Sequence, residues 1–512
     1  MHALNTENLV IHLQNSVMYL RRYIAMISMF ILIVTSTTVS MAQNFSLQQL
    51  IRNAQSESLA RLEAENRKKN RSWAYQAFKA SYKPRLVLRG TLPAFNRSIE
   101  PVIQPDGSQV FRERSLSSSR LNLNLEQNIG LTGGTIFLGS QLERIDLFNE
   151  QSPNITTYAS TPLRIGIFQP LFSYNAYKWD NLVQPLIYEE SQKAYVEELE
   201  TIASDINSLF FNALMAQIDF ELANTNIKSI DTLYLIGLER YKIATISKSD
   251  LLRLELSKVQ AGQLQADARV TLQEAQLKLN SYLGSKMLSD SAKYIIPKSI
   301  PNLEINPAIA LDQAKNNREQ WVKLRRQKIE ADQQVAKAKG ESGLQVDING
   351  SFGQSSTAQN LSMLFPLQQQ QQVLEIGLAV PILDWGRQRA IRKSAEANKQ
   401  LTMVSVSRNE LQFEQEIITM CQKIPILKSR VLNAEIASSI AKETFEMALT
   451  RYGSGNMTLT DLGIVQENKD KTKRDYVTAL RDFWTSYYQL RLLTLYDFQN
   501  NEQIRYTSKN GL

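Results

Sequence analysis

Two kinds of hydrophobic periodicity alternate along this chain. Between residues 250 and 283, apolar side chains recur every three or four positions, which is the spacing of a helix. They form two separate stripes. One stripe consists of Leu252, Leu256, Val259, Ala266, Val270 and Leu277, and the other of Leu254, Ala261, Leu264, Ala268, Leu272, Ala275 and Leu279. Two stripes on one helix predict packing neighbours on two sides, as in a barrel of coiled coils.

Residues 85–170 follow a different period. Apolar and polar positions alternate there, most clearly where Asn122, Asn124 and Glu126 separate the apolar residues Leu121, Leu123 and Leu125. A period of two indicates strands, and the Gly133-Gly134 pair predicts a tight turn between two of them.

A second region of strands is predicted over residues 344–382. We expect strands over 344–352 and 373–382, joined by a loop that holds the polar run 368–372. Alternating segments of about ten residues split by polar loops are typical of outer-membrane β-barrels.

The remaining segments are helical and unusually long. Residues 173–240 contain no Pro after Pro185, and about 55 helical residues would span on the order of 80 Å. Ser46 begins the first predicted helix in the manner of an N-cap, and Pro84 follows its end. Further helices are predicted over residues 46–82, 308–339, from 387 to the turn near 453, and 460–498.

The pattern repeats within the chain. Arg240-Tyr241 matches Arg451-Tyr452 at an offset of 211 residues, and two further pairs share that offset: Asp250 with Asp461, and Pro170 with Pro381. Earlier segments match at an offset of 260, as in Ala54 with Ala314 and Gly90 with Gly350. The first β region is therefore 49 residues longer, which is the size of one additional hairpin. We infer an internal duplication.

The duplication divides the chain. The first repeat spans residues 43–283, with a helical hairpin tip at 241–249, and the second spans 307–500, with a tip at 452–460. Residues 284–306, which contain Gly284 and two Pro, form the linker between them, and residues 501–512 form a C-terminal tail.

Residues 1–42 are predicted to be a secretory signal peptide. Arg21 and Arg22 precede an apolar run that ends at Val34, and Ala42 follows a small-residue cleavage pattern. Met18 is the more natural start because it leaves a signal of ordinary length. A membrane anchor would need about 20 apolar residues, and the polar residues from Thr35 onward end this run too early.

Composition excludes several classes of function. The 58 basic and 50 acidic side chains are not gathered into Lys/Arg blocks, so nucleic acid is not an expected partner. The only histidines are His2 and His12, and the only cysteine is Cys421. A mature chain without histidine has no histidine-based catalysis and no Cys/His zinc site. We therefore expect no enzyme, no cofactor and no metal site.

A duplicated unit of helix, β-hairpin, long helix, turn and helix, behind a signal peptide, resembles the TolC-type outer-membrane efflux proteins. The resemblance covers residues 44–500. Its best local marks are Arg451, Tyr452, Gly455 and Asp461, their counterparts Arg240, Tyr241 and Asp250, and the junction sequence from Val380 to Arg387.

The resemblance implies a mainly α fold with transmembrane β structure. Three copies would share one β-barrel in the lipid of the outer membrane, continued by a long periplasmic barrel of coiled-coil helices. A chain with four to six strands cannot close a barrel by itself, since an open sheet edge cannot face lipid. The sequence leaves open whether each copy contributes four or six strands.

The implied function is a passive export duct. The protein would be the outer-membrane channel of a tripartite efflux or type I secretion system and would dock a periplasmic adaptor and an inner-membrane pump. The alternative is a coiled-coil envelope scaffold or adhesin, although an adhesin has no need of two matched β insertions. A third possibility, a hydrolase that uses carboxylates, is disfavoured because the sequence shows no paired carboxylates in a compact, pocket-forming context.

The resemblance also assigns roles at the two tips. It places Tyr452 and Asp250 in a tie that holds the tip shut, and Asp461 in a ring of carboxylates that narrows the pore. Met457 stands where a linking Arg is expected, and Ile464 where a second Asp ring is expected. The alternative role for both aspartates is capping of a helix N-terminus.

Two further sets of candidate residues complete the interpretation. We expect the turn residues to form the adaptor-docking tip, namely Arg240, Tyr241, Arg451, Gly453 and Gly455. Aromatic residues also cluster just after the last strand of each repeat, and among them Trp179 and Trp385 are candidates for a belt at the membrane interface. Ordinary packing at the junction of strand and helix is the alternative for the aromatic residues.

Overall fold

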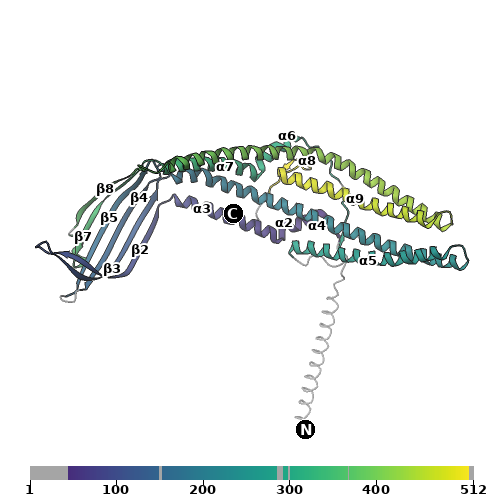
Figure 1. The fold of residues 1–512 in the computed structure, drawn as a ribbon, viewed down its shortest axis with the longest axis horizontal. Helices are drawn as coiled ribbons and strands as arrows, with labels where there is room; N and C mark the ends of the chain where they lie inside the picture. The colour runs from purple at the N-terminus through teal and green to yellow at the C-terminus, as the bar shows by residue number, and fades with distance from the viewer. Residues whose placement is uncertain (1–43, 149–152, 285–291, 298–299, 367, 507–512) are drawn as a thin grey trace, which may run out of the picture. The chain divides into compact units, whose positions relative to one another are not determined.

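The computed structural model describes residues 44–148, 153–284, 292–297, 300–366 and 368–506 (Figure 1). The predicted signal peptide over 1–42 lies outside the described residues, as do parts of the predicted linker and tail. The chain divides into two compact units, which are described separately. The hairpin unit comprises Met1–Leu59, Asp205–Ile300 and Val431–Arg481, and the sheet unit comprises Ala60–Ser204, Pro301–Arg430 and Asp482–Leu512.

The sheet unit contains one antiparallel sheet of six strands among the described residues. Its order is β2-β3-β4-β5-β7-β8, so the chain adds each strand beside the preceding one (Figure 1). The strands are β2 (Arg85–Ile103), β3 (Gln109–Asn128), β4 (Thr135–Phe148), β5 (Ile155–Leu171), β7 (Gln345–Ala358) and β8 (Gln369–Ala379). The first β region supplies four strands and the second supplies two, so the extra length of the first region holds one additional hairpin.

Alternation places the apolar side chains of these strands on one face of the sheet. One row across five strands consists of Leu86, Leu125, Leu138, Ile165 and Phe352, paired neighbour to neighbour. These side chains are exposed, with Leu86 at 65% and Ile165 at 52%. Because side chains alternate between faces, the residues next to them, such as Asn124, point to the opposite and more polar face. In the part of the chain that the structure describes, no element covers this apolar face.

The polar run near residue 370 corrects the prediction of a loop. Residues Gln369 to Gln372 belong to β8 and pair in register with Ser355 to Phe352 of β7. Backbone groups form the ladder between strands, and Gln supplies these groups as well as any other residue except Pro. The alternation of apolar side chains shows which residues face lipid or a core, but it does not show where backbone pairing ends.

The helices of the sheet unit follow the same order as the strands. They are α3 (Leu59–Ser81), the first part of α4 (Ala176–Lys242), α7 (Glu319–Glu341) and the first part of α8 (Arg387–Gly453). A stacked ring pair joins α3 to α4 through Tyr75 and Tyr188, whose centroids lie 4.6 Å apart. Ion pairs join the others, from Arg326 to Glu190 at 2.8 Å and from Lys328 to Glu410 at 2.9 Å.

Two helices that the sequence predicts as continuous are each broken once. The first consists of α2 (Leu47–Glu57) and α3, separated by Ser58, and the second of α6 (Pro307–Asn317) and α7, separated by Arg318. Both break residues have extended backbone, with ψ of 156° and 142°. Arg318 forms an ion pair with Glu197 at 2.9 Å, so a contact distant in sequence holds this break. No Gly or Pro marks either break. Predicted N-caps are confirmed at the first helix, where Ser46 accepts a hydrogen bond from the Gln49 amide.

The lengths of the helices repeat. Helices α4 and α8 have 67 residues each, and α5 (Lys248–Leu283) and α9 (Leu459–Thr494) have 36 each, with bounds offset by 211. The short helices α2 and α6 have 11 residues each and α3 and α7 have 23 each, with bounds offset by 260. These are the offsets at which the sequence repeats.

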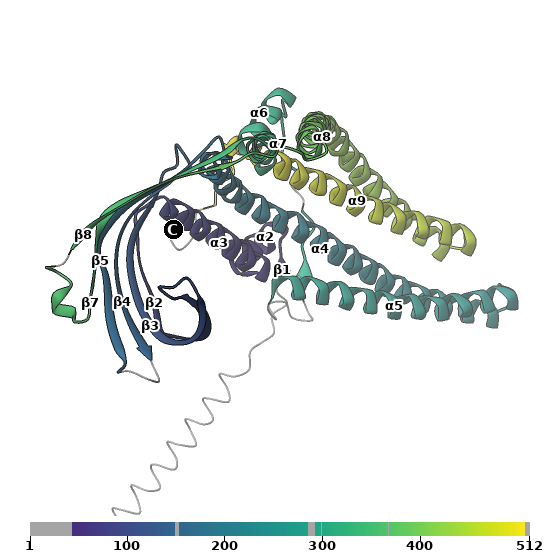
Figure 2. The same cartoon turned by 60° about the vertical axis from the view of Figure 1, so that its left-hand side comes forward.

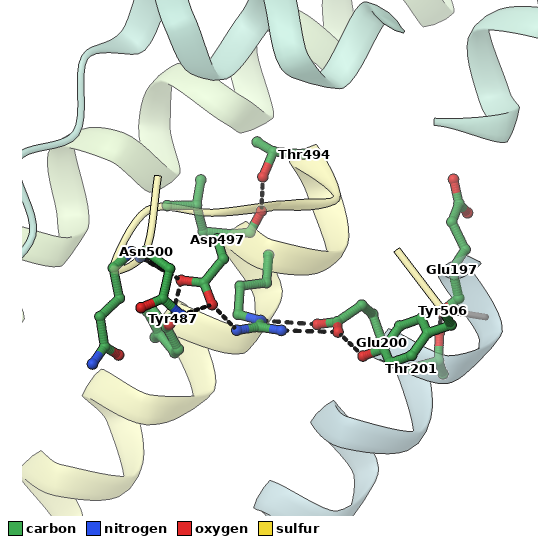
Figure 3. Close-up of polar contacts among 11 residues, drawn as sticks. Glu197, Glu200, Thr201, Tyr487, Thr494, Asp497, Asn500 and Tyr506 are labelled. Carbon is green, nitrogen blue, oxygen red and sulfur yellow. Dashed lines mark hydrogen bonds and ion pairs between the residues drawn. The ribbon is translucent and has the colours of Figure 1, made fainter. Parts of the chain in front are cut away.

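A buried ion-pair network fixes the C-terminal segment within the sheet unit (Figure 3). Glu200 of α4 is fully buried, and its two oxygens each accept a hydrogen bond of 3.0 Å from Arg491 of α9. The third nitrogen of Arg491 donates to Asp497 at 2.9 Å, and the hydroxyl of Tyr506 donates to Glu200. A buried charge is tolerated only when it is paired and hydrogen-bonded, and here every partner comes from a different part of the chain.

The hairpin unit contains the ends of the two helical hairpins. Its helices lie in the order α5, α4, α9, α8 (Figure 2). Lys258 of α5 pairs with Asp231 of α4 at 2.9 Å, and Arg474 of α9 pairs with Asp219 of α4 at 2.6 Å. Helix α9 in turn contacts α8, where the amine of Lys469 lies 4.3 Å from the ring centroid of Phe445. Two short strands, β1 (Asn44–Phe45) and β6 (Lys293–Tyr294), pair in parallel in the same unit.

The two apolar stripes predicted on α5 are covered to different extents by the other described helices. The stripe that contains Leu254 and Leu279 is buried at these two side chains, which are 1% and 0% exposed, whereas Leu264 in its middle is 64% exposed. The other stripe is exposed along its length, with Val259 at 65% and Leu277 at 67%. In the hairpin unit, α8 also carries exposed apolar side chains at helical spacing, namely Leu432, Ile436, Ile440 and Met447.

Candidate functional site at the helical hairpin tips

The two turns at the hairpin tips have the same backbone conformation. Each turn has five residues, 243–247 between α4 and α5 and 454–458 between α8 and α9. In the first, the amides of Ala244 and Thr245 donate to the carbonyls of Tyr241 and Arg240. The second turn has the same pair of bonds 211 positions later. This is the Schellman arrangement, in which one residue adopts the left-handed conformation and satisfies the last carbonyls of the helix.

The left-handed position is filled differently in the two turns. Gly455 has φ of 83° in the second turn, and Ala244 has φ of 58° at the matching position of the first. Gly453 does not have a positive φ, and nothing lies within 4 Å of the place where its Cβ would stand. Of the two glycines in this turn, only Gly455 is required by the backbone conformation.

Asp250 and Asp461 both cap the helix that follows their turn. The Asp250 carboxylate accepts hydrogen bonds from the amide and hydroxyl of Ser247, at 3.3 and 2.7 Å, and the Asp250 amide donates to the Ser247 hydroxyl at 3.1 Å. Thr458 and Asp461 make the corresponding bonds of 2.7 and 3.1 Å through their side chains and the Asp461 amide. The hydrogen bonds from Ser247 hold the pKa of the Asp250 carboxyl below its usual value. The capping role that we considered as the alternative is therefore present at both positions.

The structure of the single chain does not join Asp250 to Tyr452, the pair that the resemblance places in a tie. Among the described residues, the hydrogen bonds of the Asp250 carboxylate go to Ser247, and none joins it to Tyr452. Tyr452 is buried and lies under Arg240, whose Cζ is 5.5 Å from the centroid of its ring. The preference for Ser247 is local. Asp250 is the third residue of α5 and the Ser247 hydroxyl lies only three residues before it, so this hydrogen bond forms without ordering any further part of the chain.

Apolar packing joins all four helices behind the turns. A buried cluster contains Leu233 of α4, Leu254 of α5, Phe445, Ala448 and Tyr452 of α8, and Leu462 of α9. Met457, at the position of the expected linking Arg, packs against this cluster. Ile464, at the position of the expected second Asp ring, is 54% exposed. At these two positions the tip carries apolar side chains where the resemblance implies polar ones.

The candidate docking residues are not equivalent. Tyr241 is 39% exposed, and Arg451, Gly453 and Gly455 are exposed, so these four lie at the surface of the tip. Arg240 is only partly exposed and points to the other hairpin. Sequence reasoning missed this difference because Arg240 and Arg451 occupy the same position of the repeat.

Comparison with known proteins finds a match to one family. Residues 310–494, which run from α6 to the last residue of α9, match the family model described as outer membrane efflux protein. This part of the chain is similar to the outer membrane efflux protein family. A search of curated protein sequences finds no match.

Solved structures extend the likeness to the whole efflux-protein fold. The CmeC outer membrane channel of Campylobacter jejuni has a TM-score of 0.64 at 14% identity, covering 90% of this chain and 87% of that one. A membrane protein from Pseudomonas aeruginosa has a TM-score of 0.63 at 15% identity, covering 88% and 90%. The outer membrane protein VceC from Vibrio cholerae has a TM-score of 0.60 at 15% identity, covering 90% and 97%. The first repeat therefore also has the fold of these solved structures, although the family model matches residues of the second repeat only.

The matched family is described as one of the outer membrane. Among the described residues, no helix is both long enough and apolar enough to cross a membrane. Trp385 lies in the turn between β8 and α8 and is 90% exposed, while Trp179 lies in the first turn of α4, just after β5, and is partly exposed. Both are therefore found at the junction of strand and helix, as the sequence predicts.

Metal binding and thiol chemistry would each depend on a few side chains in the described part of the chain. No group of three or more His, Cys, Asp or Glu is placed there to hold a metal ion. Cys421 is buried in α8, and burial raises the pKa of its thiol to about 11. A thiol with that pKa is protonated at neutral pH and is a poor nucleophile.

Proposed function

We propose that the protein is a passive export duct, the outer-membrane channel of a tripartite efflux or type I secretion system. In this proposal it is a homotrimer. The three sheets share one β-barrel, and the helices of the three copies form a periplasmic coiled-coil barrel. The hairpin tips dock a periplasmic adaptor, which passes on cargo from an inner-membrane pump.

The observation that carries the proposal is that the six-stranded sheet and the layer of helices in the hairpin unit are both open at their sides. Strands β2 and β8 each pair with one neighbour among the described residues, and the apolar face of the sheet is uncovered. An unpaired strand edge cannot face lipid, because its backbone groups would have no partner there. Copies of the same chain can pair β8 of one sheet with β2 of the next until the ring closes.

The helical layer supports the same assembly. In the hairpin unit, the outer helices α5 and α8 both carry exposed apolar stripes. Exposed stripes of this length mark a surface that packs against another element. In a closed ring, α8 of one copy would lie beside α5 of the next, so the exposed stripe predicted from the sequence would find its second neighbour.

The division of the chain is part of the proposal. The equal lengths and constant offsets of the helices support an internal duplication into residues 43–283 and 307–500, with 284–306 as linker and 501–512 as tail. Trp179 and Trp385 would then lie at the same level of the shared barrel and form its periplasmic aromatic belt. Asp461 of three copies would form the carboxylate ring of the pore.

The test measures mass and conductance of the purified full-length protein in detergent. Light scattering should give three chains per particle, and planar bilayers should show ion-conducting channels. A folded monomer that conducts would contradict the trimer. A trimer that never conducts would contradict the duct and favour the envelope scaffold.

A further inference from the structure

Arg240 and Arg451 hold the same position in the two repeats but have different surroundings. Nη2 of Arg240 lies 3.3 Å from the carbonyl oxygen of Gly453 and 3.5 Å from that of Tyr452, both on the other hairpin. Its guanidinium also lies over the ring of Tyr452. Arg451 is exposed, and no hydrogen bond or ion pair of its side chain is found among the described residues.

The contacts of Arg240 suit the end of a helix. Tyr452 and Gly453 are the last two residues of α8, where carbonyl groups have no partner within the helix. The partial negative charge at a helix C-terminus attracts a cation. A guanidinium can donate to these carbonyls while its flat face lies on an aromatic ring, and the amine of lysine cannot do both. Arg240 of the first hairpin therefore caps the first helix of the second hairpin.

The partners of Arg240 are held in place. Tyr452 belongs to the buried cluster and is 7% exposed, so its ring is fixed by packing on the side away from the guanidinium. Asp250 and Asp461 are each engaged by the cap of their own helix. Arg240 is thus the charged side chain for which the structure shows contacts across the two turns.

We propose that Arg240 is the positioning residue that ties the two hairpin tips together and sets how readily they separate. The proposal rests on the proposed duct, in which separation of the tips opens the pore. It differs from the Tyr452–Asp250 tie in the atoms involved, because the Tyr452 ring and two backbone carbonyls take part and the Tyr452 hydroxyl does not.

The first test measures the separation of the tips directly. Cysteines that carry spin labels replace the exposed residues Lys242 and Ser454 in a Cys421→Ser background. These chains are produced together with an excess of chains without the introduced cysteines, so that the measured distance lies within one chain. Arg240→Met should move the distance distribution to longer values and broaden it, and Arg240→Lys should do the same. Arg451→Met, the matched variant of the second repeat, should leave the distribution unchanged. An unchanged distribution in Arg240→Met overturns the tie.

The second test measures opening in planar bilayers. Arg240→Met should raise the open fraction on the order of tenfold, which is the effect of losing one charge-assisted hydrogen bond. Arg451→Met should behave as the wild type, and Tyr452→Phe, which keeps the ring and the carbonyls, should raise the open fraction far less than Arg240→Met does. If Tyr452→Phe opens the pore as far as Arg240→Met, the hydroxyl is the tie and the proposal is wrong.

The two tests separate this proposal from the duct itself. If the wild-type protein forms no channels, the proposed function fails, and the spin labels still decide whether Arg240 holds the tips together. If the wild type conducts and Arg240→Met matches Arg451→Met in both measurements, the duct stands and the tie is rejected.

Discussion

Ala244 and Gly455 meet the same backbone requirement with different chemistry. The left-handed conformation brings a Cβ close to a carbonyl oxygen, and glycine avoids this contact. We expect Ala244→Gly to stabilise the first turn by about 1 kcal/mol or less and Gly455→Ala to destabilise the second by a similar amount. Hydrogen exchange of the Thr245 and Asn456 amides, which close the two turns, measures each change.

A neighbouring glycine provides the control for that comparison. Gly453→Ala adds a Cβ into open space at an ordinary φ and should leave the exchange of Asn456 unchanged. Faster exchange in Gly453→Ala than in Gly455→Ala would show that the left-handed conformation is not what the turn requires.

Asp461 has two candidate roles that a matched pair of variants separates. Asp461→Ala and Asp250→Ala each remove the carboxylate that accepts from the capping residue, which weakens the start of the helix. Only Asp461 is proposed to form a ring of three carboxylates, and crowded like charges bind cations to relieve their repulsion. We therefore expect Asp461→Ala alone to weaken block by multivalent cations and to reduce cation selectivity in planar bilayers. Equal behaviour of the two variants would leave Asp461 as a cap only.

The lowered pKa of the Asp250 carboxyl decides the pH at which that measurement is made. The folded pKa of its carboxyl lies below the unfolded value, so the cap contributes stability above the unfolded pKa and loses it as the pH falls through the lowered folded pKa. At neutral pH the cap is fully formed. Bilayer recordings near pH 7 therefore compare the two aspartates without a contribution from acid loosening of the first turn.

At the scale of the element, the exposed stripe of α5 makes the clearest prediction. Val259 is 65% exposed in the single chain and would be covered in the proposed trimer. Val259→Asp would bury an unpaired carboxylate in each interface, which costs several kcal/mol per site. We expect a folded chain that no longer forms heat-resistant trimers, measured by light scattering and circular dichroism. Gln260→Asp, at an exposed polar position between the two stripes of the same helix, should leave the trimer intact.

A trimer that survives Val259→Asp would show that this stripe faces something other than a second copy. Leu254 on the other stripe provides the opposite comparison, because it is 1% exposed and belongs to the buried cluster of the tip. A charge at Leu254 should unfold the tip in the single chain, whether or not copies assemble.

At the scale of the whole molecule, the sheet and the helices pose the same problem. In the sheet, the inner strands are paired on both sides, whereas the outer strands β2 and β8 are each paired on one side only. In the hairpin unit, α5 and α8 are the outer helices of the layer. A closed ring of copies satisfies the sides of both layers with a single assembly. This agreement between backbone pairing and apolar packing is what favours a duct over a scaffold, which would need only the helices.

The sequence by itself determined the elements and their repetition. Helical and strand periods, the offsets of 211 and 260 and the turn residues follow from local rules, because each depends on a few neighbouring side chains and on the backbone between them. The bounds of α5, the start of α9 and the additional hairpin of the first β region could be obtained in this way, as could the capping role considered for Asp250 and Asp461.

Only the tertiary structure decided what each surface touches. Periodicity shows that α5 has two apolar stripes, but the stripe that α4 and the buried cluster cover depends on the path of the chain. The break at Arg318 depends on Glu197, and the Gln run near 370 is a strand because β7 lies beside it. Arg240 and Arg451 are the same residue in the same repeat position, and only one of them reaches a carbonyl of the other hairpin. Contacts between distant segments leave no periodic trace in a single chain, and for that reason the sequence could not distinguish these two arginines.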